Sequence, residues 1–212
     1  MSFSIIAFDE EEGLFGSAVA SNLIAIGGII PVYRKAVGLV HAQGQVFPKG
    51  AESILDFLQK GIPISQSIDL TLTADENSPQ RQYLACDHGG NFDAYSGDAC
   101  NPIYETIISK NCVVGGNILN HSDIVGKMVE TYEVNSQLPM AERLLLSLER
   151  GESIGGDERG TKSASLKIYS DVHPHSNKRL PDLRVDSHRT PVTELRNLYN
   201  EFNANGPRTF MY

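Results

Sequence analysis

The chain opens with SFSIIAFDEEEGLFGSAVASN, residues 2–22, and this stretch decides the fold. Two strand-like runs, residues 4–9 and 14–21, are joined by an acidic turn that ends at Gly13. In the second run small residues follow one another closely, which is typical of a strand that another backbone approaches. An antiparallel pair of strands is therefore predicted at the start of the chain.

The elements that follow occur in groups rather than in alternation. Helices and strands of the same kind succeed one another in pairs, which favours antiparallel sheets covered by helices over a parallel sheet with crossover helices. The sequence thus predicts an α+β protein. Further strands are expected at residues 37–43, 80–87, 91–96, 111–114, 163–169 and 183–186. Helices are expected at residues 51–58, 65–72, 124–132, 139–148 and from Pro191 to about residue 202. Ser65 is expected to cap the second of these helices, and Ser122 is the expected N-cap of the third.

Composition and charge narrow the class of protein. The 212 residues, 41% hydrophobic and 21% charged, are consistent with one globular domain over residues 1–212, whose segment 204–212 is a candidate for docking or oligomer contacts. A formal charge of −8 argues against binding to nucleic acid or to an anionic membrane. The longest apolar stretch, residues 23–33, is too short to span a bilayer.

Cysteine usage and the first charges indicate a compartment. The three cysteines form no Cys-x-x-Cys pair, which suits a reducing environment and gives no zinc or disulfide pattern. The early charges are acidic, whereas a secretory leader begins with basic residues. We therefore expect a cytoplasmic protein without membrane or nucleic-acid partners.

Four blocks of sequence resemble the DUF1028 family, and together they extend to about residue 198. Single blocks would be weak, but four in the same order make the resemblance specific. It implies a four-layer αββα sandwich of two antiparallel sheets, the architecture of N-terminal-nucleophile (Ntn) hydrolases, and it does not establish an activity. The blocks are residues 1–7 with 16–22, residues 95–100 with 116–119, residues 141–145 with 155–164, and residues 182–188 with 191–196.

The chain departs from the family pattern after the third strand. Where such proteins usually have Thr-Gln and then Asn-Pro, this sequence has Ala42 before Gln43 and Phe47 before Pro48. His41 is an unusual neighbour of these residues, and its role is left open, as is that of His188. A pocket built by this loop is expected to bind something different here.

The Ntn resemblance implies that Ser2 is the nucleophile after removal of Met1. The hydroxyl of such a residue attacks a carbonyl while the α-amino group of the same residue, with a pKa of about 8, accepts the proton. An opening Met-Ser is also common in proteins without such chemistry. Moreover, the Asp expected at the end of the second strand is replaced by Ser21-Asn22, and the lysine expected before the third strand has only Arg34 and Lys35 as near candidates.

The glycine-rich loop 155–160 is a second candidate part of the site. Asp157 could orient the amino terminus and Arg159 could bind a substrate carboxylate, or the two could be a structural pair that holds the loop. Asn117, after Gly116, could supply an oxyanion donor from its backbone or its amide, or could form a tight turn. The other expected substrate contacts are Asn22, Arg34, Gln43 and Ser163.

Other motifs favour plain interpretations. The tract His173-Pro174-His175 lacks partners at metal-ligand spacing, so it is expected to be a solvated loop. Cys100 lacks a basic neighbour, so it is expected to be a buried small side chain. No metal and no cofactor are predicted.

Two functions remain open at this stage. The first is an Ntn-type amidohydrolase acting on a small amide or peptide-like substrate. The second is a non-catalytic binding or scaffold protein on the same fold. A homo-oligomer, most simply a two-fold dimer, is expected, because the sequence has large apolar side chains beyond Gly206 and Pro207. These side chains could pack on a second copy or on their own domain.

Overall fold

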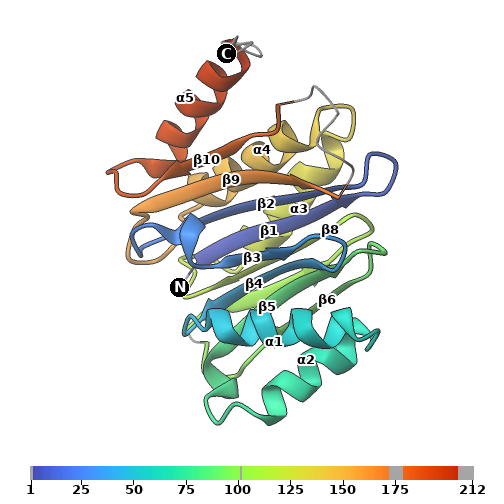
Figure 1. The fold of residues 1–212 in the computed structure, drawn as a ribbon. Coiled ribbons are helices and arrows are strands. Elements are labelled where there is room, and N and C mark those ends of the chain that lie inside the picture. Colours follow the sequence, from blue (N-terminus) through green and yellow to red (C-terminus); the bar gives the residue numbers. More distant parts are fainter. Residues whose placement is uncertain (1, 101, 172–178, 205–212) are drawn as a thin grey trace.

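The computed structural model describes residues 2–100, 102–171 and 179–204. The histidine tract at 173–175 and the tail from residue 205 onward lie outside this part of the chain, so the expectations about them stay untested. The described residues form two sheets, of six and four strands, and every strand pair is antiparallel (Figure 1).

The six-stranded sheet has the order β10-β9-β2-β1-β8-β7, with the first strand of the chain near its middle. The four-stranded sheet has the order β3-β4-β5-β6. The strands are β1 (Ser2–Asp9), β2 (Leu14–Ser21), β3 (Pro31–Arg34), β4 (Gly38–Gly44), β5 (Arg81–Asp87), β6 (Phe92–Ser96), β7 (Tyr104–Ile108), β8 (Cys112–Asn117), β9 (Ser163–Ser170) and β10 (Asp182–Val185).

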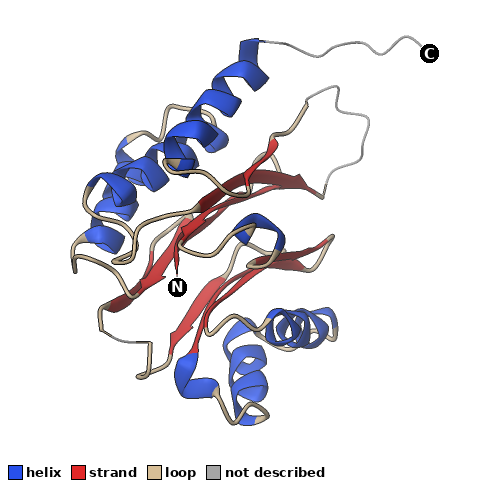
Figure 2. Cartoon of the chain, turned by 90° about the vertical axis from the view of Figure 1, so that its left-hand side faces the viewer, coloured by secondary structure: helices blue, strands red, loops and turns tan. Residues whose placement is uncertain are grey.

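Helices cover the outer face of each sheet, so the molecule has four layers (Figure 2). Three of them, α3 (Ile124–Val134), α4 (Met140–Ser153) and α5 (Pro191–Ala204), pack on the six-stranded sheet. The other two, α1 (Pro48–Gln59) and α2 (Ile64–Thr73), pack on the four-stranded sheet. The αββα sandwich of two antiparallel sheets expected from the sequence is therefore confirmed.

The helices pack through apolar stripes of helical spacing. In α4, Leu144, Leu145 and Leu148 are fully buried and belong to one core cluster with Phe3 and Ile5 of β1. Such i, i+3 and i+4 stripes are what a helix needs to cover a sheet on one side.

The face of β1 that meets the other sheet changes from polar to apolar along the strand. Phe3, Ile5 and Ala7 face the helices, so the alternation of the strand turns Ser2, Ser4 and Ile6 toward the other sheet. Around Ile6 the space between the sheets is apolar. Around Ser2 and Ser4 it is polar, and this polar end is where the candidate site lies.

Some local expectations were wrong. Pro63, not Ser65, occupies the N-cap of α2, because its extended backbone (ψ 149°) precedes the first helical turn. Asp123, not Ser122, is the N-cap of α3. The strands β3 and β7 were not expected as separate elements.

Candidate active site between the sheets

Ser2, the first residue of β1, lies between two polar neighbours. It pairs with Ser21 on β2. On the other side, Phe3 pairs with Gly116 of β8, so the antiparallel register places Ser2 opposite Asn117. Its side chain is fully buried, and its Oγ has no hydrogen-bond partner among the described residues. A buried hydroxyl without a partner is unusual and calls for an explanation.

Gln82 on β5 is the centre of a hydrogen-bond network between the sheets. Its Nε2 donates to the carbonyl oxygen of Gly116 at 3.0 Å and to Ser96 Oγ at 2.8 Å. Because a carbonyl oxygen only accepts, the nitrogen of Gln82 must face Gly116. Its Oε1 therefore faces the other way, where it accepts hydrogen bonds from Gln43 Nε2 and Asn117 Nδ2, each at 2.7 Å.

The same reasoning fixes the tautomer of His41. Since Gln43 uses Nε2 to reach Gln82, its Oε1 accepts the hydroxyl proton of Ser4 at 2.9 Å. Ser4 Oγ must then accept from His41 Nδ1–H at 2.9 Å, so His41 Nε2 accepts from Ser17 Oγ at 2.8 Å. Burial lowers the pKa of His41 to about 3, so the ring is neutral near pH 7. Its role, left open by the sequence, is to bridge the two sheets.

Asn117 belongs to the same buried network. Its Nδ2 is used by Gln82, while its buried Oδ1 has no partner among the described residues. The side chain therefore offers an acceptor, and one of the two N–H donors of its amide, which was expected to bind an oxyanion, is engaged by Gln82.

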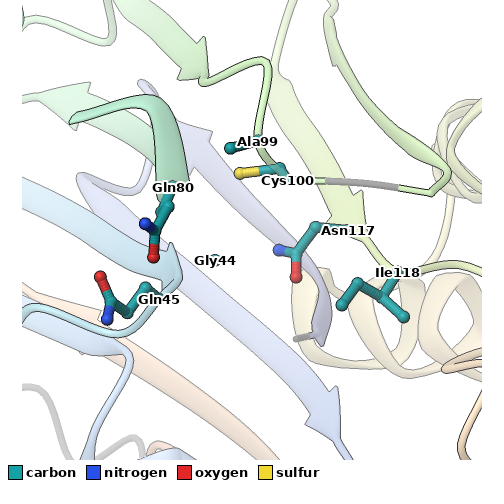
Figure 3. Close-up of a pocket in the computed structure, with 7 residues that line it drawn as sticks. All are labelled: Gly44, Gln45, Gln80, Ala99, Cys100, Asn117 and Ile118. Carbon is teal, nitrogen blue, oxygen red and sulfur yellow. The ribbon is translucent and has the colours of Figure 1, made fainter. Parts of the chain in front are cut away.

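A cavity of about 440 Å³ opens at the polar end of the sandwich. Figure 3 shows the Asn117 carboxamide pointing toward Gly44 and Cys100. Burial raises the pKa of the Cys100 thiol, which therefore stays protonated near neutral pH, in keeping with a buried small side chain. The described residues that line the cavity are Gly44, Gln45, Gln80, Ala99, Cys100, Asn117 and Ile118.

Ile118 adds backbone strain at this cavity. It follows Asn117 with φ +48°, in the left-handed region that a β-branched residue rarely adopts. Its carbonyl accepts from Glu158 N at 3.1 Å, which ties the strained turn to the glycine-rich loop. Conformations of this kind cost about 1–3 kcal/mol and cluster at functional sites.

The glycine-rich loop lies at the same end of the six-stranded sheet. Asp157 accepts from the backbone N of Asn22 at 3.1 Å, next to Ser21 on β2, and its backbone bridges to Leu119 beyond β8. Its buried carboxylate also accepts from Arg159 Nε at 3.1 Å and Nη2 at 3.0 Å. The two side chains hold each other and the loop.

The remaining sequence-predicted residues separate into two places. Gln43 belongs to the buried network, and Asn22 Nδ2 and Ser163 Oγ bind backbone carbonyls of loops at the same end, at 2.7 Å to Gly160 and 2.5 Å to Leu23. Arg34 is not brought to the site. It lies at the other end of the four-stranded sheet, opposite Gly38, and binds α1.

The distance between Arg34 and the cavity follows from the strand geometry. From Gly38 to Gly44, β4 spans six residue steps, roughly 20 Å at 3.3 Å per residue. The guanidinium of Arg34 contacts Glu52 and Asp56 of α1, each at 2.7 Å. His188, left open by the sequence, is exposed and accepts from Thr190 N at 3.2 Å. It shapes the turn before α5.

Sequence reasoning missed the polar residues that matter most to the network. Gln82, Ser4 and Ser17 were not singled out, nor were Gln45 and Gln80 at the cavity. A signal was present, since a buried strand rarely carries Ser or Gln at alternate positions without partners. The partners, however, belong to strands far away in the sequence.

The fold and the site together define a class. Two antiparallel sheets stacked between helices, with the start of the first strand at a polar inter-sheet end, form a four-layer αββα sandwich. The chain belongs to DUF1028, a family of unknown function, whose model matches residues 2–195. The family resemblance found in the sequence is confirmed.

The solved structure of a DUF1028 member agrees with the family assignment. Protein SPO2555 from Silicibacter pomeroyi, a DUF1028 member, is 27% identical and superposes with a TM-score of 0.85, covering 98% of this chain and 93% of its own. Anbu, an ancestral β-subunit from Yersinia bercovieri, is 10% identical, with a TM-score of 0.43 over 96% of this chain and 95% of its own. No curated protein matches the sequence. Within the described residues, none of the helices has the length and apolar character needed to cross a membrane.

Proposed function

We propose that the protein is an Ntn-type amidohydrolase that acts on a small amide. The observation that carries this proposal is the buried, unpartnered hydroxyl of Ser2 opposite Asn117, at the end of the sandwich where the cavity opens. Once Met1 is removed, the α-amino group of Ser2 becomes a base of suitable pKa beside that hydroxyl.

The reaction needs two steps. Ser2 Oγ attacks the amide carbonyl and its proton passes to the α-amine, which then protonates the departing amine as the C–N bond breaks. Water attacks the resulting ester, releases the acid and restores the hydroxyl. The geometry supports the first step because, within the described part of the chain, no hydrogen bond competes for Ser2 Oγ.

The N-terminal mass and the reactivity of Ser2 test this function. We expect the intact mass of the purified chain to lack Met1. We also expect a small β-lactone, whose ring opens on a nucleophilic hydroxyl, to form an ester on Ser2 in a tryptic map. Ser2→Ala should slow this acylation on the order of a thousandfold or more, whereas Ser136→Ala, in the loop before α4, should leave it unchanged. Retained Met1, or equal acylation of the Ser2→Ala chain, would sink the proposal.

One observation favours the alternative of a non-catalytic binding protein. The carboxylate of Asp157 is occupied by Arg159 and by the backbone of Asn22. It is therefore committed to the loop and is not available to orient an amino terminus. A binding protein would retain the cavity and its affinity for ligands, and would show no acylation of Ser2.

The cellular setting is also part of the proposal. Cys86, Cys100 and Cys112 are buried free thiols, which suits a reducing cytoplasm.

A two-fold homodimer is also part of the proposal, because exposed apolar side chains such as Ile24 (61%) and Val134 (67%) leave surface for it. Light scattering of the full-length chain tests the dimer, and a monomer mass contradicts it.

A further inference from the structure

Asn117 presents an unsatisfied acceptor inside the molecule. The residue is 1% exposed, and its Oδ1 has no partner among the described residues. An acceptor buried in this way carries the full penalty of desolvation unless something donates to it. Its natural occupant therefore bears an N–H or O–H group.

The orientation of the Asn117 carboxamide is fixed. If the amide were flipped, its oxygen would face Gln82 Oε1, and two acceptors would then oppose each other. Gln82 cannot flip in response, because its nitrogen is held by the carbonyl of Gly116. Asn117 Oδ1 thus stays in place as an acceptor and needs a donor on the ligand.

The cavity is electrically neutral along its described lining, which carries three carboxamides, one thiol and no charged side chain. The neighbouring cation, Arg81, is itself buried and is neutralised by Asp75 at 2.6 Å. It also donates to the carbonyl oxygen of Gln45 at 2.7 Å. Arg159, the expected partner of a substrate carboxylate, is paired with Asp157. An anionic ligand would therefore find no side-chain counter-ion among the described residues that line the cavity.

We propose that this cavity selects ligands that carry an amide N–H, and that Asn117 Oδ1 accepts the hydrogen bond from that N–H. This inference deepens the proposed function, on which it rests for the amide being the group that Ser2 attacks. With the N–H on Asn117, the carbonyl carbon of the same amide lies on the side of Ser2, the residue opposite on β1. Primary and secondary amides fit this arrangement, whereas esters, tertiary amides and carboxylates do not. Gln82 is a positioning residue, since it acts only by orienting Asn117.

Matched small molecules test the selection. Saturation-transfer NMR titrations of the full-length chain would compare N-methylbutanamide with N,N-dimethylbutanamide, methyl butanoate and butanoate. We expect N-methylbutanamide to bind on the order of tenfold more tightly than each of the others, because only it satisfies the buried acceptor. Equal affinities, or no detectable binding of N-methylbutanamide up to its solubility limit, would overturn the inference.

Variants separate this inference from the proposed chemistry. The same titrations in the Ser2→Ala chain should retain the preference, so that a failure of hydrolysis leaves the binding result intact. Asn117→Leu should bind the two amides equally, while Asn120→Leu, an exposed position outside the cavity lining, should behave as the parent chain does. If Asn117→Leu retains the preference, the assignment of Oδ1 is wrong. If that variant does not fold, the comparison of ligands in the parent chain decides.

Discussion

Replacing Gln82 with leucine is expected to lower the free energy of unfolding by about 3–5 kcal/mol. The two side chains are similar in size, so the loss comes from hydrogen bonds and not from a cavity. The change removes the partner of Asn117 Nδ2 and the acceptor of Gln43 Nε2, and it frees the carbonyl of Gly116. Each buried group left without a partner costs about 1–3 kcal/mol.

Urea unfolding of the full-length chain, followed by circular dichroism, measures this loss. Gln59→Leu is a suitable control, because Gln59 accepts a hydrogen bond from Arg34 at 3.0 Å on an exposed surface. Surface changes of that kind usually stay within about 0.5 kcal/mol. A Gln82→Leu chain within 1 kcal/mol of the parent, by the same measure, would mean that the buried network adds little to stability.

The fold was predictable from the sequence, apart from two edge strands. The grouping of helices and strands predicted antiparallel sheets covered by helices, and the family resemblance implied the four layers. The apolar runs predicted most strands within a few residues. The missed strands β3 and β7 each lie at the edge of a sheet, and most of their residues are half-buried. Edge strands contact the core on fewer sides, so their apolar alternation is weak.

The candidate site was predictable only in part. Ser2, Gln43 and Asn117 could be named because they fall in or beside blocks that resemble the family. Gln82 could not, because both faces of β5 are buried and alternation alone does not tell which face meets the other sheet. The position of Arg34 could not be predicted for a related reason, since the sequence does not reveal at which end of a sheet a short strand finishes.

His41 should make the protein sensitive to acid. Burial lowers its pKa from 6.5 to about 3 in the folded chain, whereas the unfolded chain keeps the ordinary value. Between these two values the unfolded state binds the extra proton, so stability is fully present above about pH 6.5 and falls as the pH drops. The slope is about 1.4 kcal/mol per pH unit, which gives a loss of about 2.5 kcal/mol between pH 7.5 and pH 4.5.

Unfolding experiments at several pH values, on the parent chain and on His41→Gln, isolate this contribution. Glutamine can still hydrogen-bond Ser4 or Ser17 but does not titrate, so the stability advantage of the parent should shrink by about 2.5 kcal/mol over that range. Asp75 and Glu152, whose pKa values are also shifted, affect the pH dependence of stability differently. Arg81 lowers the pKa of Asp75, which removes stability only below about pH 4, while burial raises the pKa of Glu152, which opposes the loss at acidic pH. These groups are common to both chains and cancel in the difference. A difference that stays constant from pH 7.5 to pH 4.5 would show that His41 is not held neutral by its position between Ser4 and Ser17.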